Sequence, residues 1–291
     1  MAGSKKAIIQ TLLYSTLFDF PLTEDEIYYY LQSDTLISKT DFKKSFSSLK
    51  NILVTNGSFY TLKGFERSIE LRRKRKLISE KKRQEGFKIA RYLGYIPTIL
   101  FIGLSGSVAV ENADETDDID FFVVTTNGSL YTTRLLILII LQVLGRRRKR
   151  NELRPHNKAC VNMLVDQDGM YLKNSHDLYT ARELVQLYPL FERDGYYQKL
   201  LKKNSWTRSF MPHAVGHRNE FLHKKTIFLQ SFSFLEFICR ILEQKLIKRN
   251  QTREIVTNHV IALHPFDTKN KVLIKVKEHT IHYSKYYTDH Y

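Results

Sequence analysis

The sequence predicts an α+β protein with a central sheet between two regions rich in helix. Three short apolar segments, within "IPTILFIGLSGS", "DIDFFVVTT" and "KACVNMLVD", read as strands, and a long apolar helix over 130–145 separates the last two. Apolar side chains at helical spacing over 7–20, and again beyond Leu178, predict helices at both ends. The 291 residues, 43% of them apolar, suffice for one large domain or two to three smaller ones.

Residues 1–66 predict a small domain of three helices and a hairpin. The first helix covers 7–20, and "DFPLTEDEI" then supplies a proline break, a threonine N-cap and acids in the next first turn. A third helix fits 39–51, and "ILVTNGSFYTL" predicts two strands joined at Asn56-Gly57. This order describes a winged-helix-like domain. A generic helical cap with a β-ribbon gives the same pattern.

A basic helix over 67–95 leads into the central domain, expected over 67–175. Its first part, "RSIELRRKRKLISEKKR", holds nine Lys or Arg in 17 residues. Such a segment is either a solvated helix whose long stems cover apolar neighbours or a phosphate-binding face. After the third strand and the Asp168-Gly169 turn, 176–291 predict a helical C-terminal region with breaks near Pro189 and within 210–219.

The acidic residues that lead the second strand predict a metal site. Asp118 and Asp120 are two apart on a strand, so both carboxylates leave one face and repel each other. A bound Mg²⁺ relieves this repulsion and can also hold a triphosphate. The turn Ser105-Gly106-Ser107 has no bulky side chain, so its backbone N–H groups and serine hydroxyls can approach phosphate oxygens. Asp117, of opposite parity, is expected to be a turn residue.

This arrangement resembles the signature of the DNA polymerase β-like nucleotidyltransferase superfamily. Gly106-Ser107 follow a strand, ten residues intervene, and Asp118-Ile119-Asp120 open the next strand. The segments "LFDFPLTEDEI", "YTTRLLILIILQVLG", "DLYTARELVQLYPLF" and "ALHPFDTKNKVL" look like a bacterial and archaeal group with an N-terminal winged-helix-like region. The resemblance implies a nucleotidyltransferase-type mixed core sheet of five strands with helices.

The resemblance also implies a chemistry and its residues. Asp118 and Asp120 would bind two Mg²⁺ ions, or Mn²⁺, while Gly106 and Ser107 hold the β- and γ-phosphates of an NTP, expected to be ATP. A nucleoside monophosphate then passes to a hydroxyl of a nucleic acid, a protein or a small molecule, with loss of pyrophosphate. Among these acceptors, the winged-helix-like region and the net charge of +16 favour nucleic acid.

A third carboxylate on a neighbouring strand normally completes such a site, and here the pattern departs. Asn162 stands at the best position in "CVNMLVD", and an amide can bind a metal through its oxygen but cannot act as a base. Asp166 shares its parity but lies about 13 Å further along an extended strand. We expect Asn162 in the site and Asp166 at the strand end, with Asp166 as the alternative metal ligand. The second hypothesis is that the chain has lost turnover because Asn162 replaces an acid. The protein would then be a nucleic-acid-binding or regulatory module.

Arg134, near the start of the helix over 130–145, has two interpretations. A guanidinium there is unfavourable with the helix dipole unless an anion compensates it. Arg134 therefore either contacts a phosphate or forms an ion pair with a loop acid.

The remaining features bear on compartment and partners. The two cysteines, Cys160 and Cys239, each stand among apolar neighbours, so we expect neither disulfides nor a thiolate metal site, and a reducing cytoplasm fits best. The N-terminus lacks a signal-peptide cleavage site, and the apolar run 135–144 is half the length of a membrane span, so no transmembrane segment is expected. The positive charge also suits an anionic membrane surface. The sequence does not indicate the oligomeric state.

Overall fold

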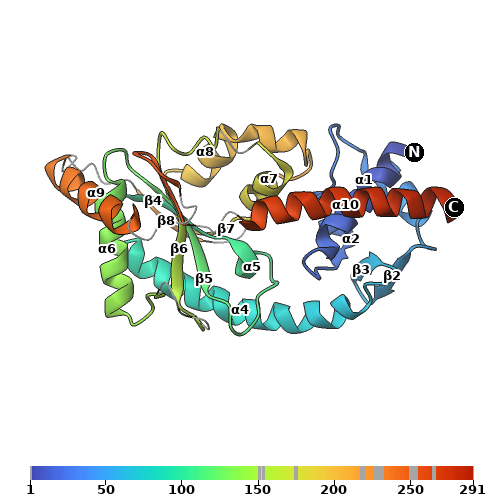
Figure 1. The fold of residues 1–291 in the computed structure, drawn as a ribbon, viewed down its shortest axis with the longest axis horizontal. Coiled ribbons are helices and arrows are strands. Elements are labelled where there is room, and N and C mark those ends of the chain that lie inside the picture. The colour runs from blue at the N-terminus through green and yellow to red at the C-terminus, as the bar shows by residue number, and fades with distance from the viewer. Residues whose placement is uncertain are drawn as a thin grey trace.

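A seven-stranded mixed sheet forms the centre of the computed structural model, which describes residues 2–149, 152, 155–173, 176–216, 221–225, 233–248, 255–263 and 267–290 (Figure 1). The three predicted strands are its middle: β4 (Ile99–Leu104), β5 (Ile119–Thr125) and β6 (Ala159–Asp166). β5 runs antiparallel to β4 and parallel to β6. The order across the sheet is β8-β7-β4-β5-β6-β10-β9.

The C-terminal region corrects the prediction of a helical 176–291 and of a five-stranded sheet. It contributes β7 (Tyr188–Arg193), β8 (Leu222–Lys224), β9 (Ile255–Val256) and β10 (Val260–Ala262) to the sheet. β7 pairs with β4 and β10 with β6, which covers two strand edges that would otherwise expose unpaired backbone groups. The expected boundary at 175 therefore runs through one shared core. Pro189 is not a helix break but lies in β7, next to a shift in the β4–β7 register.

Helices cover both faces of the sheet. On one face lie α4 (Arg67–Leu93) and α6 (Leu130–Val143), with α9 (Ser233–Lys248) against α6. On the other face lie α7 (Leu178–Val185), α8 (Tyr196–Lys203) and a 3-10 helix (Ser205–Ser209). Within β5, Ile119 and Phe121 join the first core while Phe122 joins the second. By the same alternation Asp120 faces α7 and α8.

The N-terminal residues form a unit of three helices and a small sheet. Its elements are α1 (Ala2–Thr16), β1 (Leu22–Thr23), α2 (Glu24–Tyr29), α3 (Lys39–Ser47), β2 (Leu53–Asn56) and β3 (Phe59–Leu62). The predicted N-cap is confirmed, since the Thr23 hydroxyl accepts from the N–H of Glu26 and the Glu26 carboxylate accepts from the N–H of Thr23. The predicted hairpin is also present, with Gly57 at φ 80°, and β1 adds a third strand. The winged-helix assignment stays a prediction.

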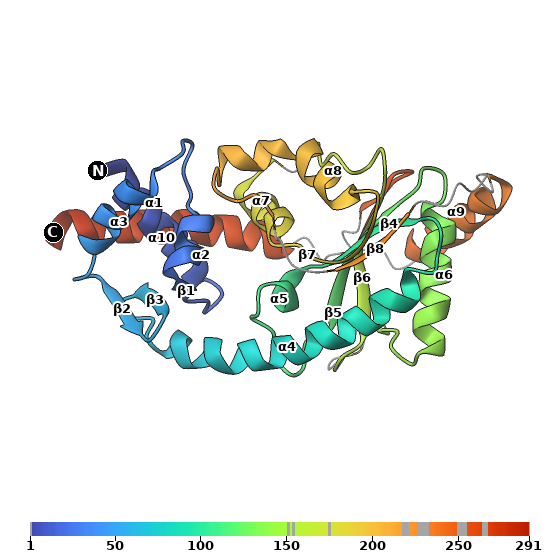
Figure 2. The ribbon, with the colours of Figure 1, turned by 180° about the vertical axis from the view of Figure 1, so that it is seen from behind.

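Two long helices link this unit to the sheet. α4 leads from β3 to the first face of the sheet, and α10 (Asp267–His290) passes α7 and continues along α1 (Figures 1 and 2). Apolar residues of α7, Ala181 and Val185, complete the N-terminal core. Among the described residues, no helix has the length and apolar character needed to cross a bilayer.

Candidate metal and nucleotide site

The Ser105-Gly106-Ser107 turn leaves β4 directly beside the Asp120 carboxylate. Gly106 has φ 62° and begins the one-turn helix α5 (Gly106–Ala109). A Cβ at this position would lie 2.9 Å from Oδ2 of Asp120, so only glycine fits both the conformation and the contact. The N–H of Ser105 donates to the backbone carbonyl of Asp120 at 2.9 Å. The glycine turn and Asp120, which the sequence predicted to act together, thus lie side by side.

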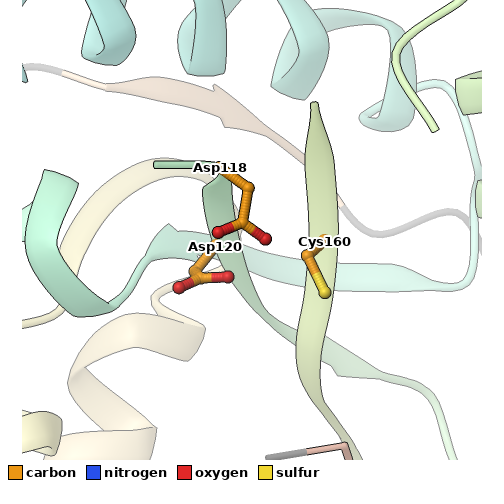
Figure 3. A group of neighbouring side chains, drawn as sticks. All are labelled: Asp118, Asp120 and Cys160. Atoms are coloured by element: carbon orange, nitrogen blue, oxygen red, sulfur yellow. The ribbon is translucent and has the colours of Figure 1, made fainter. Parts of the chain in front are cut away.

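Asp118, directly before β5, and Asp120 of β5 project toward the same space as Cys160 of β6 (Figure 3). One potential ligand atom from each of the three lies within 4.8 Å of the other two. The register of the parallel pair places Cys160 directly beside Asp120. The predicted convergence of the two aspartates is therefore present in the structure, and Cys160 joins them.

The surroundings of Asp120 disfavour its negative charge. Burial raises the pKa of its carboxyl well above the usual value, and the negative charge of Asp118 raises it further. Arg148 and a hydrogen bond from Asn162 act in the opposite direction. Oδ1 of Asp120 is enclosed and has no hydrogen-bond partner in the described part of the chain. An enclosed carboxylate oxygen without a donor fits a divalent cation.

Asp118 already has one cationic neighbour. Its Oδ2 lies 2.5 Å from Nη1 of Arg148, whose side chain is 35% exposed. Arg148 belongs to the basic run 146–150, of which residue 150 lies outside the described residues. The Arg148 side chain is thus half-buried and neutralises part of the charge of Asp118.

Asn162 of β6 stands at the position where a third metal ligand was expected. A register shift between Phe121 and Phe122 lets β6 carry one extra residue, so Asn162 has no register partner on β5. Its side chain nonetheless reaches the site, because Sγ of Cys160 donates to Oδ1 of Asn162 at 2.9 Å and Asn162 bonds to Asp120. The Asn162 side chain therefore lies next to Asp120, and its role in a metal site stays a prediction.

Cys160 was not predicted to take part, because a lone cysteine in an apolar strand is usually a core residue. Burial and the two aspartates raise the pKa of its thiol to about 12, which keeps it protonated at neutral pH. A protonated thiol is a poor ligand for Mg²⁺, which prefers oxygen. The donor set that fits Mg²⁺ is therefore Asp118, Asp120 and the Asn162 amide, with Cys160 as a neighbour.

Asp166 and Arg134 lie elsewhere, which corrects their expected roles. Asp166 pairs with Thr125 at the far end of β6, where its carboxylate accepts from the N–H of Gly169 and contacts Nδ1 of His259, both at 2.8 Å. It caps the turn after the strand and cannot ligate the same ion as Asp120. Arg134 is on α6, on the opposite face of the sheet, and pairs with Glu243 of α9 at 2.6 Å. The ion-pair interpretation holds, with a helical partner instead of a loop acid.

Ser107 and Asp117 together shape the loop between β4 and β5. The Ser107 hydroxyl donates to Oδ2 of Asp117 at 2.7 Å, and the same oxygen accepts from the N–H of Asp114 at 3.1 Å. Asp117 is thus the turn residue that its parity predicted. The hydroxyl of Ser107 is therefore engaged within the loop.

Some cations of the basic helix α4 hold this loop in place. For these side chains, neither a solvated surface nor a phosphate-binding face describes the role. Lys82, 3% exposed, donates to the carbonyls of Glu115 and Asp117 and to Oδ1 of Asn157. Arg72, 1% exposed, donates to the carbonyls of Val110 and Glu111. These buried cations are structural and do not contact a solvent phosphate.

A cavity of about 520 Å³ opens beside the site. Ser105, Gly106, Ser107 and Asp120 line it from the sheet. From α1 and α7 it is lined by side chains to which the sequence analysis assigned no role in the site: Tyr14, Tyr179, Arg182 and Glu183. Burial raises the pKa of Glu183 to about 7, and the charge of Glu183 in turn raises the pKa of Asp120. The volume is that of a small-molecule pocket.

No protein-family model, no curated protein and no solved structure matches this chain.

Proposed function

We propose that this protein is a Mg²⁺-dependent nucleotidyltransferase that moves a nucleoside monophosphate from an NTP, such as ATP, to a hydroxyl acceptor and releases pyrophosphate. The observation that carries the proposal is the enclosed Oδ1 of Asp120, which lies near Asp118 and the Gly106 turn and has no hydrogen-bond partner among the described residues. An acidic pair next to a glycine turn is what a cation bound to a polyphosphate requires. Mn²⁺ fits the same oxygen donors.

Different residues of the site would bind the metal and the phosphates. Asp118 and Asp120 would hold the cation, with the Asn162 amide oxygen as a further donor. When bound, the ion neutralises negative charge that develops on the transferred phosphoryl group. The backbone N–H groups of Gly106 and Ser107 bind phosphate oxygens, because the turn brings no side chain between them and the cavity.

Glu183 supplies the base that the strand lacks. It lines the same cavity as Asp120, and a pKa of about 7 suits proton transfer near neutral pH. The acceptor oxygen forms a bond to the α-phosphorus, and the bond from that phosphorus to the bridging oxygen breaks. Pyrophosphate leaves with the electron pair, and the hydroxyl proton passes to Glu183.

The test is pyrophosphate release from each of the four labelled NTPs with Mg²⁺ or Mn²⁺, in the presence of a small-molecule acceptor mixture, RNA or protein. We expect release with at least one NTP and its loss by 100-fold or more in Asp120→Asn. Asp168→Asn is the matched control, because Asp168 is an exposed acid beyond the far end of β6. No release under any condition, or equal release from Asp120→Asn, would contradict the proposal.

One observation favours the second hypothesis, a nucleic-acid-binding or regulatory module without turnover. Arg148 neutralises Asp118 where a metal would bind, and no strand supplies a third carboxylate in the described part of the chain. Nucleic-acid binding that persists in Asp120→Asn, without pyrophosphate release from the parent chain, would establish this alternative.

A further inference from the structure

Arg182 of α7 is an internal cation that faces the cavity. It is 1% exposed and belongs to the cavity lining. Its guanidinium carbon lies 3.7 Å from the ring centroid of Tyr30 and 5.2 Å from that of Tyr14. Both tyrosines are buried in the N-terminal core region. Aromatic faces attract and orient a guanidinium, but they leave its N–H donors without acceptors.

Two of the three guanidinium nitrogens of Arg182 have no acceptor among the described residues. Nε and Nη1 are enclosed and have no hydrogen-bond partner in the part of the chain that the structure describes. No described carboxylate forms an ion pair with this side chain, although the charges of Glu26 and Glu183 act on it from a distance. A buried charge without a partner is strongly unfavourable, and such groups are usually paired.

The other fully buried arginines show how this fold normally satisfies a guanidinium. Arg193 donates from Nε to the carbonyl of Ile99, from Nη1 to that of Lys225 and from Nη2 to that of Gly94. Arg72 leaves its Nε without a partner among the described residues, but it forms ion pairs with Glu26 and Glu111. Arg182 differs from both in having its free donors beside a cavity.

The other cations of the cavity do not share this property. Lys269 pairs with Asp177 at 2.6 Å, and Lys173 is exposed at the rim. Arg182 is thus the buried cation of the cavity that lacks a bonded acceptor among the described residues. Its planar fork of N–H groups matches the oxygens of a phosphate or a carboxylate.

We propose that Arg182 binds a phosphate or carboxylate group of a small-molecule acceptor, which makes this cavity the acceptor site. The anion site follows from Arg182 alone, whereas the acceptor role rests on the proposed nucleotidyl transfer. One cavity holds Arg182 and also Asp120 and Glu183, so a single small ligand can reach the anion site and the reacting groups together. Aromatic and apolar side chains between them, Tyr14, Phe18 and Leu187 among others, favour an acceptor with an apolar or planar body.

Calorimetric titration of the full chain with inorganic phosphate and with malonate, without metal or nucleotide, tests the anion site. We expect saturable binding of at least one of them and a loss of 10-fold or more in affinity in Arg182→Gln. Lys173→Ala is the matched control, because it removes another cation that lines the same cavity, and it should retain the affinity within about threefold. No binding to the parent chain, or equal binding to Arg182→Gln, would overturn the proposal.

Two further measurements cover folding and the source of the anion. If Arg182→Gln does not fold, arsenate soaked into crystals of the parent protein should give an anomalous peak within hydrogen-bond distance of Nε or Nη1, and an empty cavity would overturn the proposal. If Arg182→Gln weakens metal-free ATP as much as phosphate, the site serves the nucleotide and the acceptor assignment is wrong. Arg182-dependent anion binding without pyrophosphate release under any condition would refute the transfer reaction alone.

Discussion

At the scale of single residues, Asp120 is a buried carboxyl next to a second acid, Asp118. Its pKa is raised, so the folded state retains a proton that the unfolded chain releases above pH about 4. The sign follows: without metal, the folded state loses stability relative to the unfolded chain as pH rises. A cation that binds the carboxylate must displace this proton, so Mg²⁺ affinity should increase with pH.

We therefore predict that Asp120→Asn stabilises the metal-free protein at high pH. An amide keeps the shape of the carboxyl without its charge, so the free energy of unfolding at pH 8 in EDTA should rise by about 1 kcal/mol or more. At pH 4 the two proteins should differ little. Urea unfolding at both values measures the difference, and a variant that is less stable at pH 8 would contradict the proposed origin of the pKa shift.

The raised pKa of Glu183 predicts how the rate of the proposed reaction depends on pH. If it accepts the acceptor proton, kcat/KM should rise with pH and level off above about 7, the pKa to which burial raises this carboxyl. Glu183→Gln cannot accept a proton, so its rate should fall by about 10²-fold or more and lose that rise. The same rise in both proteins would assign it to another group.

The part of the site that could be predicted is the part that follows from spacing along the sequence. The alternation of a strand was enough to bring Asp118 and Asp120 together, because parity depends only on sequence spacing. Cys160 was missed because its place beside Asp120 depends on the register between two strands, which no local pattern encodes. Arg182 and Glu183 come from a helix far along the chain, and only the tertiary packing of α7 brings them to the cavity.

At the scale of elements, α4 shows how one charged helix serves two purposes. Lys82 and Arg72 turn toward the loop after α5 and are buried, while neighbours such as Lys81 and Arg73 are exposed. The composition of this segment predicted a helix but left both interpretations of its charge open. Which cations are buried depends on the face of α4 that meets the loop.

Lys82→Met should destabilise the protein and loosen the loop that carries Asp117. The change leaves the carbonyls of Glu115 and Asp117 and the Asn157 amide without their shared donor, at a cost of about 2–4 kcal/mol. Lys81→Met is the control, because this exposed neighbour should change stability by less than about 0.5 kcal/mol. Thermal unfolding of both variants measures the contrast, and equal effects would show that Lys82 is not structural.

At the scale of the whole molecule, the sheet is assembled from segments on both sides of the expected domain boundary. β4, β5 and β6 were predicted because each is a dense apolar run, whereas β8, β9 and β10 are short and lack that signal. β7 was missed because Pro189 suggested a break, and its register shift next to Gly103 accommodates the proline. Long-range pairing of short strands is set by the completed core, which local sequence does not reveal.

A chain that ends at residue 175 should therefore not fold. It would lack β7 and β10, which pair with β4 and β6, and would lack α7 and α8, which cover one face of the sheet. We expect no cooperative thermal transition and aggregation through the exposed strand edges. Circular dichroism and size-exclusion chromatography of this fragment provide the test, and a monomer that unfolds cooperatively would restore the boundary.

The central claim is that Asp118 and Asp120 share a divalent cation beside the Gly106 turn. Its most direct measurement is anomalous diffraction from crystals grown with Mn²⁺ and a non-hydrolysable ATP analogue. The account predicts a manganese peak bonded to both carboxylates, Arg148 displaced from or sharing Asp118, and phosphate oxygens on the N–H groups of Gly106 and Ser107. A cluster with no peak, Arg148 still paired to Asp118 and no nucleotide at the turn would contradict it.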